Sequence, residues 1–191
     1  MKILNLYAGI GGNRKLWEGH QVTAVELDEN IAKIYKDFFP NDEVIVGDAH
    51  QYLLDHYKEF DFIWSSPPCP SHSRARYWGS FGGRVKLIYP DMSLYQEILF
   101  LKHYCKTKWV VENVVPYYKP MITGQKVGRH LYWSNFDIKE FKSSSKTFPK
   151  DCVSEMEKLY GFDLSKHKID KTLVLRNCVE PEVGLHILNC I

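Results

Sequence analysis

Two segments of the sequence carry side chains suited to nucleophilic catalysis. Cys69 follows two prolines within Ser65–Ser71, and prolines remove backbone donors and stiffen a turn. A thiolate attacks electron-poor carbon atoms, and a nearby carboxylic acid can protonate the group under attack. Glu112, followed by Asn113 and Val114, supplies such an acid. Taken alone, the cysteine is more simply explained as an inert buried thiol and the glutamate as a solvated carboxylate. Together they are a candidate catalytic pair.

A glycine-rich turn and two acidic residues indicate a cofactor site. Tyr7–Gly12 follows an apolar strand pattern, and its glycines let the backbone approach a ligand closely. The dinucleotide fingerprint G-x-G-x-x-G requires a glycine where Arg14 stands, which disfavours a nicotinamide or flavin site. Glu26 and Asp48 end the next two strand patterns, where they can accept hydrogen bonds from ribose hydroxyls and from the adenine amino group. Adenosine without a pyrophosphate fits S-adenosylmethionine better than a dinucleotide.

Strand and helix patterns alternate along the chain and predict the elements that position these residues. The helical patterns have apolar faces at Ile31–Phe38 and Leu94–Cys105, a further helix is expected to begin near Asn13, and a last one spans Pro181–Cys190. This alternation predicts an α/β fold whose mainly parallel, twisted sheet is flanked by helices and binds ligands at the carboxyl ends of its strands. The expected strands are Ile3–Tyr7, Val22–Leu27, Val44–Val46, Phe60–Trp64, Trp109–Val111 and Leu131–Phe136.

Composition narrows the class of protein. The chain has 191 residues, of which 45% are hydrophobic and 25% charged, values expected for one soluble globular domain. No apolar run is long enough for a membrane span, and no secretory signal is visible at Met1–Leu6, so we expect a cytoplasmic protein. The polar stretch Phe141–Asp151 predicts a surface loop. An odd number of cysteines without a C-x-x-C pair predicts free thiols and no metal site: Cys69, Cys105, Cys152, Cys178 and Cys190.

The sequence resembles the DNA (cytosine-5) methyltransferase family. Its first motif is matched by Leu6–Gly12, its nucleophile motif by Pro67–Cys69 and its carboxylate motif by Glu112–Val114. Further matches are Glu26 and Asp48 at the cofactor positions, Gln125 and Arg129 in Q-x-R-x-R, and Asn177, Val179 and Pro181 in the C-terminal cofactor motif. The resemblance covers about residues 1–136 and 174–190.

The sequence departs from the family pattern in four places. Asn5 stands where the family usually has Asp, and Pro70 follows the cysteine where Gln is common. Val127 replaces the first Arg of Q-x-R-x-R, and Glu180 replaces a Pro. None of these changes removes a reacting atom, but Val127 alters the usual surroundings of the target base.

The resemblance implies a Rossmann-like, S-adenosylmethionine-dependent methyltransferase that methylates C5 of cytosine in double-stranded DNA, in a bacterial or phage-infected cell. A base must leave the stack to reach such a site. The expected catalytic residues are Cys69, Glu112 and Arg129. The expected cofactor-binding residues are Tyr7, Ala8, Gly9, Ile10, Gly11, Gly12, Glu26, Leu27, Asp48, Ala49, Pro68, Asn177 and Val179.

The segment after the nucleophile, Ser71–Lys86, is the expected contact to the nucleic acid. Its sequence interleaves four cations and three aromatics with three glycines, which predicts a mobile loop that closes on phosphates and on the gap left by the base. His72 is expected to be solvated, and Tyr117, Tyr118 and Trp133 are expected to serve packing. The nucleic-acid-binding residues are predicted to be Ser71, Arg74, Arg76, Arg84, Lys86 and Gln125.

Three alternatives stay open. An RNA (tRNA) cytosine-5 methyltransferase would use the same catalytic residues, and a catalytically silent nucleic-acid-binding subunit is the alternative from another class. An amino-directed methyltransferase fits less well, because its S-P-P-aromatic motif resembles Ser66–Pro68 but a thiol follows and Glu112 goes unexplained.

The expected organisation has three parts. Residues 1–136 form the catalytic core, residues 137–173 a reduced target-recognition segment, and residues 174–191 a C-terminal motif and helix that complete the core. The middle segment is too short for a large recognition domain. We therefore expect a target of about two to four base pairs, or broad methylation with weak preference.

Overall fold

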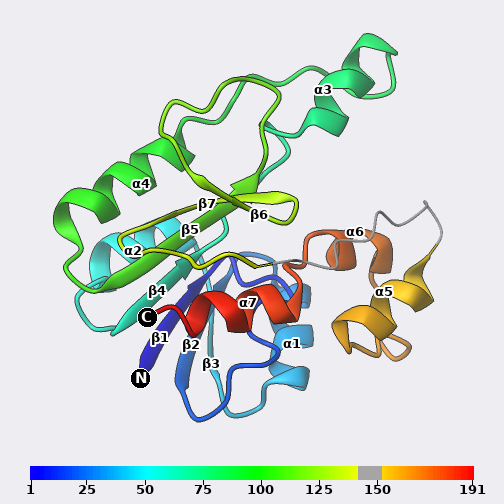
Figure 1. Ribbon diagram of the computed structural model, residues 1–191. Coiled ribbons are helices and arrows are strands. Elements are labelled where there is room, and N and C mark those ends of the chain that lie inside the picture. Colours follow the sequence, from blue (N-terminus) through cyan, green and yellow to red (C-terminus); the bar gives the residue numbers. More distant parts are fainter. Residues whose placement is uncertain (142–151) are drawn as a thin grey trace.

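The computed structural model describes residues 1–141 and 152–191. One seven-stranded sheet has the order β3-β2-β1-β4-β5-β7-β6, with helices on both faces (Figure 1). The strands are β1 (Lys2–Leu6), β2 (Gln21–Glu26), β3 (Glu43–Val46), β4 (Phe62–Ser65), β5 (Lys108–Val114), β6 (Gln125–Val127) and β7 (His130–Ser134). The helices are α1 (Glu29–Phe38), α2 (Ala49–His56), α3 (Arg74–Phe81), α4 (Ser93–Tyr104), α5 (Val153–Tyr160), α6 (Lys171–Arg176) and α7 (Pro181–Leu188).

Strands β1 to β5 run parallel, and β7 lies antiparallel to both β5 and β6. The predicted α/β class is therefore confirmed, and all six predicted strands are present with ends displaced by up to three residues. From β1 the chain builds outward to β2 and β3, then returns to place β4 on the other side of β1. Ligands of such sheets bind where the strand order reverses, so the site is expected at the carboxyl ends of β1 and β4.

Alternating residues of each strand supply two apolar layers, one on each face of the sheet. On one face Leu4, Leu6 and Ile63 pack with residues of α2 and α4. On the other, Ile3 and Phe62 pack with α7, while Ala24 packs with α1, α5 and α6. Because successive side chains of a strand point to opposite faces of the sheet, this pattern determines toward which face each side chain at the strand ends points.

The predicted helix near Asn13 is wrong. The connection from β1 to β2 is instead a series of tight turns, in which the N–H of Arg14 donates to Gly11 and that of Trp17 to Arg14, at 3.1 and 3.0 Å. Each bond spans three residues rather than the four of an α-helix. Hydrogen bonds of polar side chains, rather than those of a helix, hold this connection in place.

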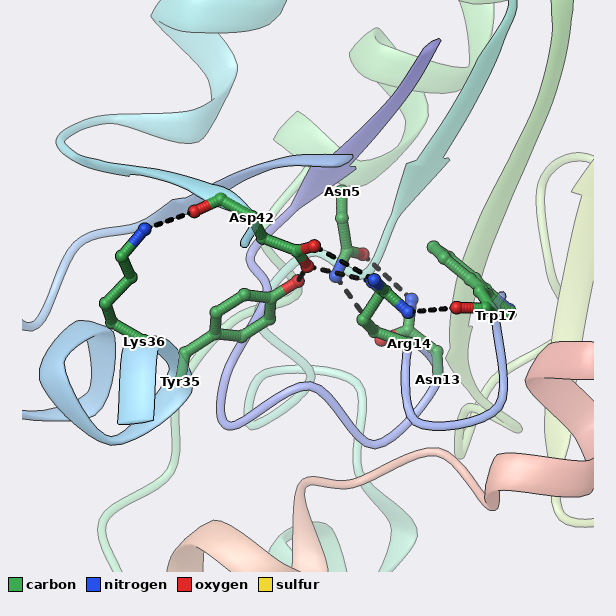
Figure 2. Close-up of polar contacts among 7 residues, drawn as sticks. All are labelled: Asn5, Asn13, Arg14, Trp17, Tyr35, Lys36 and Asp42. Carbon is green, nitrogen blue, oxygen red and sulfur yellow. Dashed lines mark hydrogen bonds and ion pairs between the residues drawn. The ribbon is translucent and has the colours of Figure 1, made fainter. Parts of the chain in front are cut away.

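A buried polar network holds this connection in place (Figure 2). The side-chain amides of Asn13 and Asn5 bond each other, the shorter contact being 2.8 Å. Arg14 makes two hydrogen bonds to the Asp42 carboxylate, of 2.8 and 2.9 Å, and the Tyr35 hydroxyl donates to the same carboxylate at 2.8 Å. A bidentate pair of this kind gives direction as well as energy. Asp42, at the end of the α1 to β3 connection, thus anchors the turn after β1.

Helix α7 crosses one face of the sheet, in front of β1 and β2 in Figure 1, and contacts the same turn. A Cβ on Gly184 would lie 2.2 Å from the carbonyl oxygen of Asn13, and a Cβ on Gly12 would lie 2.6 Å from that of Val179. Only glycine permits these approaches. The last predicted helix is confirmed, although it ends at Leu188 rather than Cys190.

The segment 137–173 is not separate from the core in its described part. Met156, Tyr160, Phe162 and Leu164 are buried in one cluster with Ile34 and other residues of α1. The predicted loop at 141–151 lies outside the described residues except for Phe141. None of the described helices is both long and apolar enough to cross a bilayer.

Candidate active site

The turn that carries Cys69 leaves the end of β4 and is tied to β5. The side-chain amide of Asn113, which is buried, donates to the carbonyl of Pro67 at 2.9 Å. On the other side of the turn, the N–H groups of His72 and Ser73 donate to the carbonyl of Cys69 at 3.0 and 3.1 Å. The thiol is therefore held by backbone contacts on both sides, at the edge of the sheet where the strand order reverses.

The structure brings the three predicted catalytic residues together. Burial raises the pKa of the Cys69 thiol, the negative charge of Glu112 raises it further, and the positive charge of Arg129 acts in the opposite direction. Glu112 lies on β5, next to β4, and Arg129 immediately precedes β7, which pairs with β5. Strand order alone thus places a thiol, a carboxyl and a guanidinium in one site.

Glu112 is buried beside His130, whose Nε2 lies 3.6 Å from its Oε1. Arg129 is exposed, and its Nη2 donates to the Tyr160 hydroxyl at 3.4 Å. Since Tyr160 ends α5, the segment expected to recognise the target also contacts the candidate catalytic arginine. His130 was not among the predicted site residues, because its approach to Glu112 depends on the pairing of β5 with β7.

The turn after β1 has the form that an adenosine cofactor requires. Gly9 has a φ of +55°, and a Cβ built on it meets no atom within 4 Å, so the backbone there borders open space. The two oxygens of Glu26 accept the N–H groups of Gly9 and Asp28, at 2.8 and 3.1 Å. Each carboxylate oxygen has a second lone pair for a ribose hydroxyl. The carboxylate is thus oriented by the turn it serves.

Asp48 caps α2 and accepts the N–H of Gln51 at 2.9 Å through Oδ1. Its Oδ2 has no hydrogen-bond partner in the described chain and suits an amino group. The residues present therefore fit the adenosine part of S-adenosylmethionine.

The other predicted cofactor contacts fall into two groups. In the first group, Ala8, Ile10, Ala49 and Val179 are buried, so their side chains serve packing, and Gly11 and Gly12 are buried without a side chain; all six offer only their backbones to a ligand. Gly11 illustrates this, because a Cβ there would lie 2.3 Å from the ring of Phe39. Tyr7 and Gly9 are half-buried, whereas Leu27, Pro68 and Asn177 are exposed.

Glu97, which we did not predict, joins three of the elements around the site. It lies on the buried face of α4 and accepts hydrogen bonds from Ser65 at the end of β4 and from Tyr7 after β1, the latter at 3.0 Å. His50 Nδ1 on α2 lies 3.2 Å away, and its hydrogen bond to Glu97 raises the pKa of His50. The sequence signal was a charged residue within the apolar pattern Leu94–Cys105.

The middle of the segment after the nucleophile is a helix, so the predicted loop is wrong for Arg74–Phe81. The Ser73 hydroxyl caps α3 by accepting the N–H of Arg76. The ring of Tyr77 stacks on Tyr117, with centroids 4.0 Å apart and planes 4° from parallel. Helix α3 lies away from the sheet (Figure 1), and Trp78 and Phe81 are exposed there.

Two residues of this segment are buried, contrary to prediction. Ser71 accepts the N–H of Asp91 at 3.0 Å, so its hydroxyl fixes the chain instead of facing a nucleic acid. His72 is 1% exposed, and its Nδ1 lies 2.6 Å from the Tyr118 hydroxyl, so it is a packed residue and not a solvated one. Trp133 is buried as expected, and Tyr117 supports α3.

The remaining predicted nucleic-acid contacts lie at the surface to different degrees. Arg74, Arg84 and Lys86 are exposed, and Arg76 is half-buried. Gln125 on β6 is exposed, but its side-chain amide donates to the carbonyl of Ile138. No group of His, Cys, Asp and Glu suited to a metal ion occurs among the described residues, and Cys69, Cys105, Cys178 and Cys190 are free thiols.

An open, mainly parallel sheet with a glycine-rich turn and acidic residues at consecutive strand ends defines the Rossmann-like fold of S-adenosylmethionine-dependent methyltransferases. The family described as C-5 cytosine-specific DNA methylase has a model that matches residues 1–115. The chain belongs to this family, and S-adenosylmethionine is the family's cofactor, as the sequence predicted.

Similar proteins include a tRNA (cytosine(38)-C(5))-methyltransferase of Spodoptera frugiperda, 34% identical over 80 residues. That match covers 38% of this chain, and the chain spans only 24% of the relative's length. A solved structure of a Spodoptera frugiperda DNMT2 mutant is 25% identical, with a TM-score of 0.43, over 59% of this chain and 35% of the other. The Entamoeba histolytica methyltransferase EhMeth is 16% identical, with a TM-score of 0.39, over 60% and 38% of the chains.

Proposed function

We propose that this protein transfers a methyl group to C5 of a cytosine in a nucleic acid, with Cys69 as nucleophile. The observation that carries the proposal is the meeting of Cys69 with Glu112 and Arg129 at the sheet edge, where both charges act on the thiol. The reaction needs a nucleophile, an acid and a cation, and the thiol, carboxyl and guanidinium groups of these three residues match those needs. S-adenosylmethionine supplies an electrophilic methyl group when it is bound.

The side chains divide the reaction among themselves. The Cys69 thiolate adds to C6 of the cytosine, and Glu112 in its protonated form donates to ring N3 and stabilises the charge that develops. C5 thereby becomes nucleophilic and takes the methyl group. Loss of the C5 proton and elimination of Cys69 then restore the ring. Arg129 binds O2 of the base from the end of the β6–β7 turn.

The cofactor is proposed to lie against the turn after β1. Glu26 binds the ribose hydroxyls, and Asp48 binds the adenine amino group. The backbone at Gly9 borders the space for the ligand. The hydrogen bond from Asn113 on β5 to the carbonyl of Pro67 ties the turn that carries Cys69 to the sheet. The sheet therefore fixes the position of Cys69 relative to the turn after β1.

Double-stranded DNA is the first proposed substrate, and helix α3 with the residues that follow it up to Lys86 is its proposed contact. Arg74, Arg84 and Lys86 supply positive charge for phosphates, and Trp78 and Phe81 supply exposed rings for stacking on unpaired bases. A structured tRNA is the second candidate, because the Spodoptera frugiperda relative is a tRNA methyltransferase.

Transfer of labelled methyl from S-adenosylmethionine to DNA and to tRNA, offered separately, tests the proposal. We expect incorporation into one of them, and none with Cys69→Ser, since an alcohol at this position is a far weaker nucleophile. Cys190→Ser, a change at the far end of α7, is the matched control and should keep the wild-type rate. DNA containing 5-fluorocytosine should trap wild-type protein covalently, because fluorine cannot leave as a proton does. Full activity of Cys69→Ser would show that the mechanism is wrong.

A further inference from the structure

His130 contacts the catalytic carboxyl through the register of the sheet. Tyr132 on β7 pairs directly with Glu112 on β5, and His130 pairs with Val114, two residues along the same face. His130 and Glu112 are therefore diagonal neighbours, a separation that long side chains can span. The distance from Nε2 to Oε1 is 3.6 Å, and the side chains are only 15% and 9% exposed. Strand pairing fixes this contact more firmly than a loop would.

The surroundings keep this imidazole neutral near pH 7. Burial is the main influence and lowers the pKa of His130, and the charge of Arg129 lowers it further. The carboxylates of Glu112 and Glu180 act in the opposite direction. The other ionisable groups whose pKa values are affected by Glu112, Glu180 or Arg129 are the Cys69 thiol and the hydroxyls of Tyr132 and Tyr160. A neutral imidazole carries one N–H donor and one acceptor nitrogen.

We propose that His130 is a positioning residue for Glu112: its Nε2 lies 3.6 Å from Oε1 in the free protein, closes to hydrogen-bond distance when the base binds, and then donates its N–H to that oxygen, which directs the proton on the other oxygen toward the base. This inference rests on the proposed function. As the bond from sulfur to C6 forms and the C5–C6 double bond breaks, the O–H bond of Glu112 breaks and its proton bonds to N3. The carboxylate left behind keeps the hydrogen bond from His130. The proton returns to Glu112 when the sulfur leaves.

The contact makes the reaction sensitive to acid in a particular direction. When His130 gains a proton, its positive charge holds Glu112 as a carboxylate, which has no proton to donate. The Cys69 thiolate is lost as the pH drops through its raised pKa, and because burial lowers the pKa of His130, protonation of His130 should add a second, separate loss of activity at lower pH, through that lowered value. A residue with only a structural role would not produce this second loss.

Three variants and a pH profile of kcat test the inference. His130→Phe removes the donor, and we expect kcat to fall about 10- to 100-fold, the range for a hydrogen bond to a charged group. His130→Gln keeps an N–H donor but does not titrate, so it should retain most of the rate and lack the second loss of activity at lower pH. His56→Gln is the matched control, because His56 also lies beside a carboxylate, Glu59, but on the surface at the end of α2.

A titration by NMR supplies a readout that needs no activity. The ring proton of His130, followed against pH, should report a lower pKa in Glu112→Gln than in the wild type, because the neighbouring carboxylate raises it. A His130 titration unchanged by Glu112→Gln, or a His130→Phe enzyme with the wild-type rate and profile, would overturn the inference. Absence of methyl transfer by the wild type would instead refute the proposed function, and the titration would still decide whether the two side chains interact.

Discussion

At the scale of single residues, the negative charge of Glu112 disfavours the thiolate form of Cys69 in the protein without substrate. The carboxylate raises the pKa of the thiol on top of the effect of burial, so the free protein holds little thiolate. Protonation of Glu112, the state that suits donation to N3, removes that negative charge and favours the thiolate. In the proposed mechanism, Glu112 and Cys69 therefore become competent together, which limits unwanted reaction of the thiol in the absence of substrate.

Alkylation of Cys69 by iodoacetamide measures this coupling. The thiolate fraction rises as pH rises through the raised pKa, so the wild type should react slowly at pH 8 and faster toward pH 10. In Glu112→Gln the pKa of Cys69 should be lower, and its alkylation at pH 8 should be several-fold faster. Peptide mapping separates Cys69 from the other thiols, and Cys178 is an internal reference because burial raises its pKa to about 12. Slower alkylation in Glu112→Gln would contradict the coupling.

Glu26 is the second residue that can be tested alone. Removing its carboxylate in Glu26→Ala should weaken S-adenosylmethionine binding by about 1–3 kcal/mol, because hydrogen bonds to a charged group are lost. Calorimetry measures the affinity directly. Glu29→Ala, on the exposed first turn of α1, is the control and should bind as the wild type does. Unchanged affinity in a folded Glu26→Ala protein would remove this residue from the cofactor site.

The sequence could predict candidate site residues where a motif determines both the type of residue and its position at a strand end. Cys69 and Glu112 meet because β4 and β5 are parallel and end at one edge, and Arg129 joins them because the antiparallel strand β7 begins at that edge. His130 could not be found this way, since its approach to Glu112 depends on the register of β7 against β5. Glu97 left a signal, a charge in an apolar helix face, but its partners come from three separate elements.

At the scale of elements, α7 can pack closely against the turn after β1 because Gly184 has no side chain. In Gly184→Ala the new Cβ would meet the carbonyl oxygen of Asn13 at 2.2 Å. Overpacking of this kind costs about 1–3 kcal/mol, more than alanine gains over glycine in a helix. We expect a correspondingly lower free energy of unfolding in urea. Gly82→Ala, whose Cβ would find its nearest neighbour at 3.8 Å, should be nearly neutral. Equal stability of the two variants would show that α7 shifts freely.

Two elements differ from prediction for reasons outside the local sequence. Helix α3 is supported by the stacking of Tyr77 on Tyr117, residues far apart in the chain. The turn after β1 forms no helix because Arg14 is bound to Asp42 and Asn13 to Asn5. Local patterns report propensity, and such distant partners override it.

At the scale of the whole molecule, the described part of the segment 137–173 commits several of its large side chains to the core, where they cannot read bases. Tyr160, Phe162 and Leu164 are committed to the core, and Tyr160 also contacts Arg129. Each base pair distinguished needs one or two side chains of its own, worth about 1–3 kcal/mol. We therefore predict that DNA, if it is the substrate, is methylated at short sites of about two to four base pairs or with weak preference.

Bisulfite sequencing of a random-sequence duplex treated with the enzyme measures the preference. The converted cytosines should share at most a few flanking positions. A strict requirement at about six or more positions would show that this segment reads far more than its length suggests, or that a second subunit does the reading. Untreated duplex from the same pool gives the background.

The close contact of α7 with the turn after β1 also bears on biosynthesis. A ribosome synthesises Gly12 and Asn13 well before the residues that press against them, Val179 and Gly184. Until then the glycine turn lacks one wall, and the sheet face that carries Ile3 and Phe62 stays uncovered. The cofactor can therefore act as a ligand for folding only after α7 has left the ribosome, and a nascent chain stalled before α7 exposes apolar surface to chaperones.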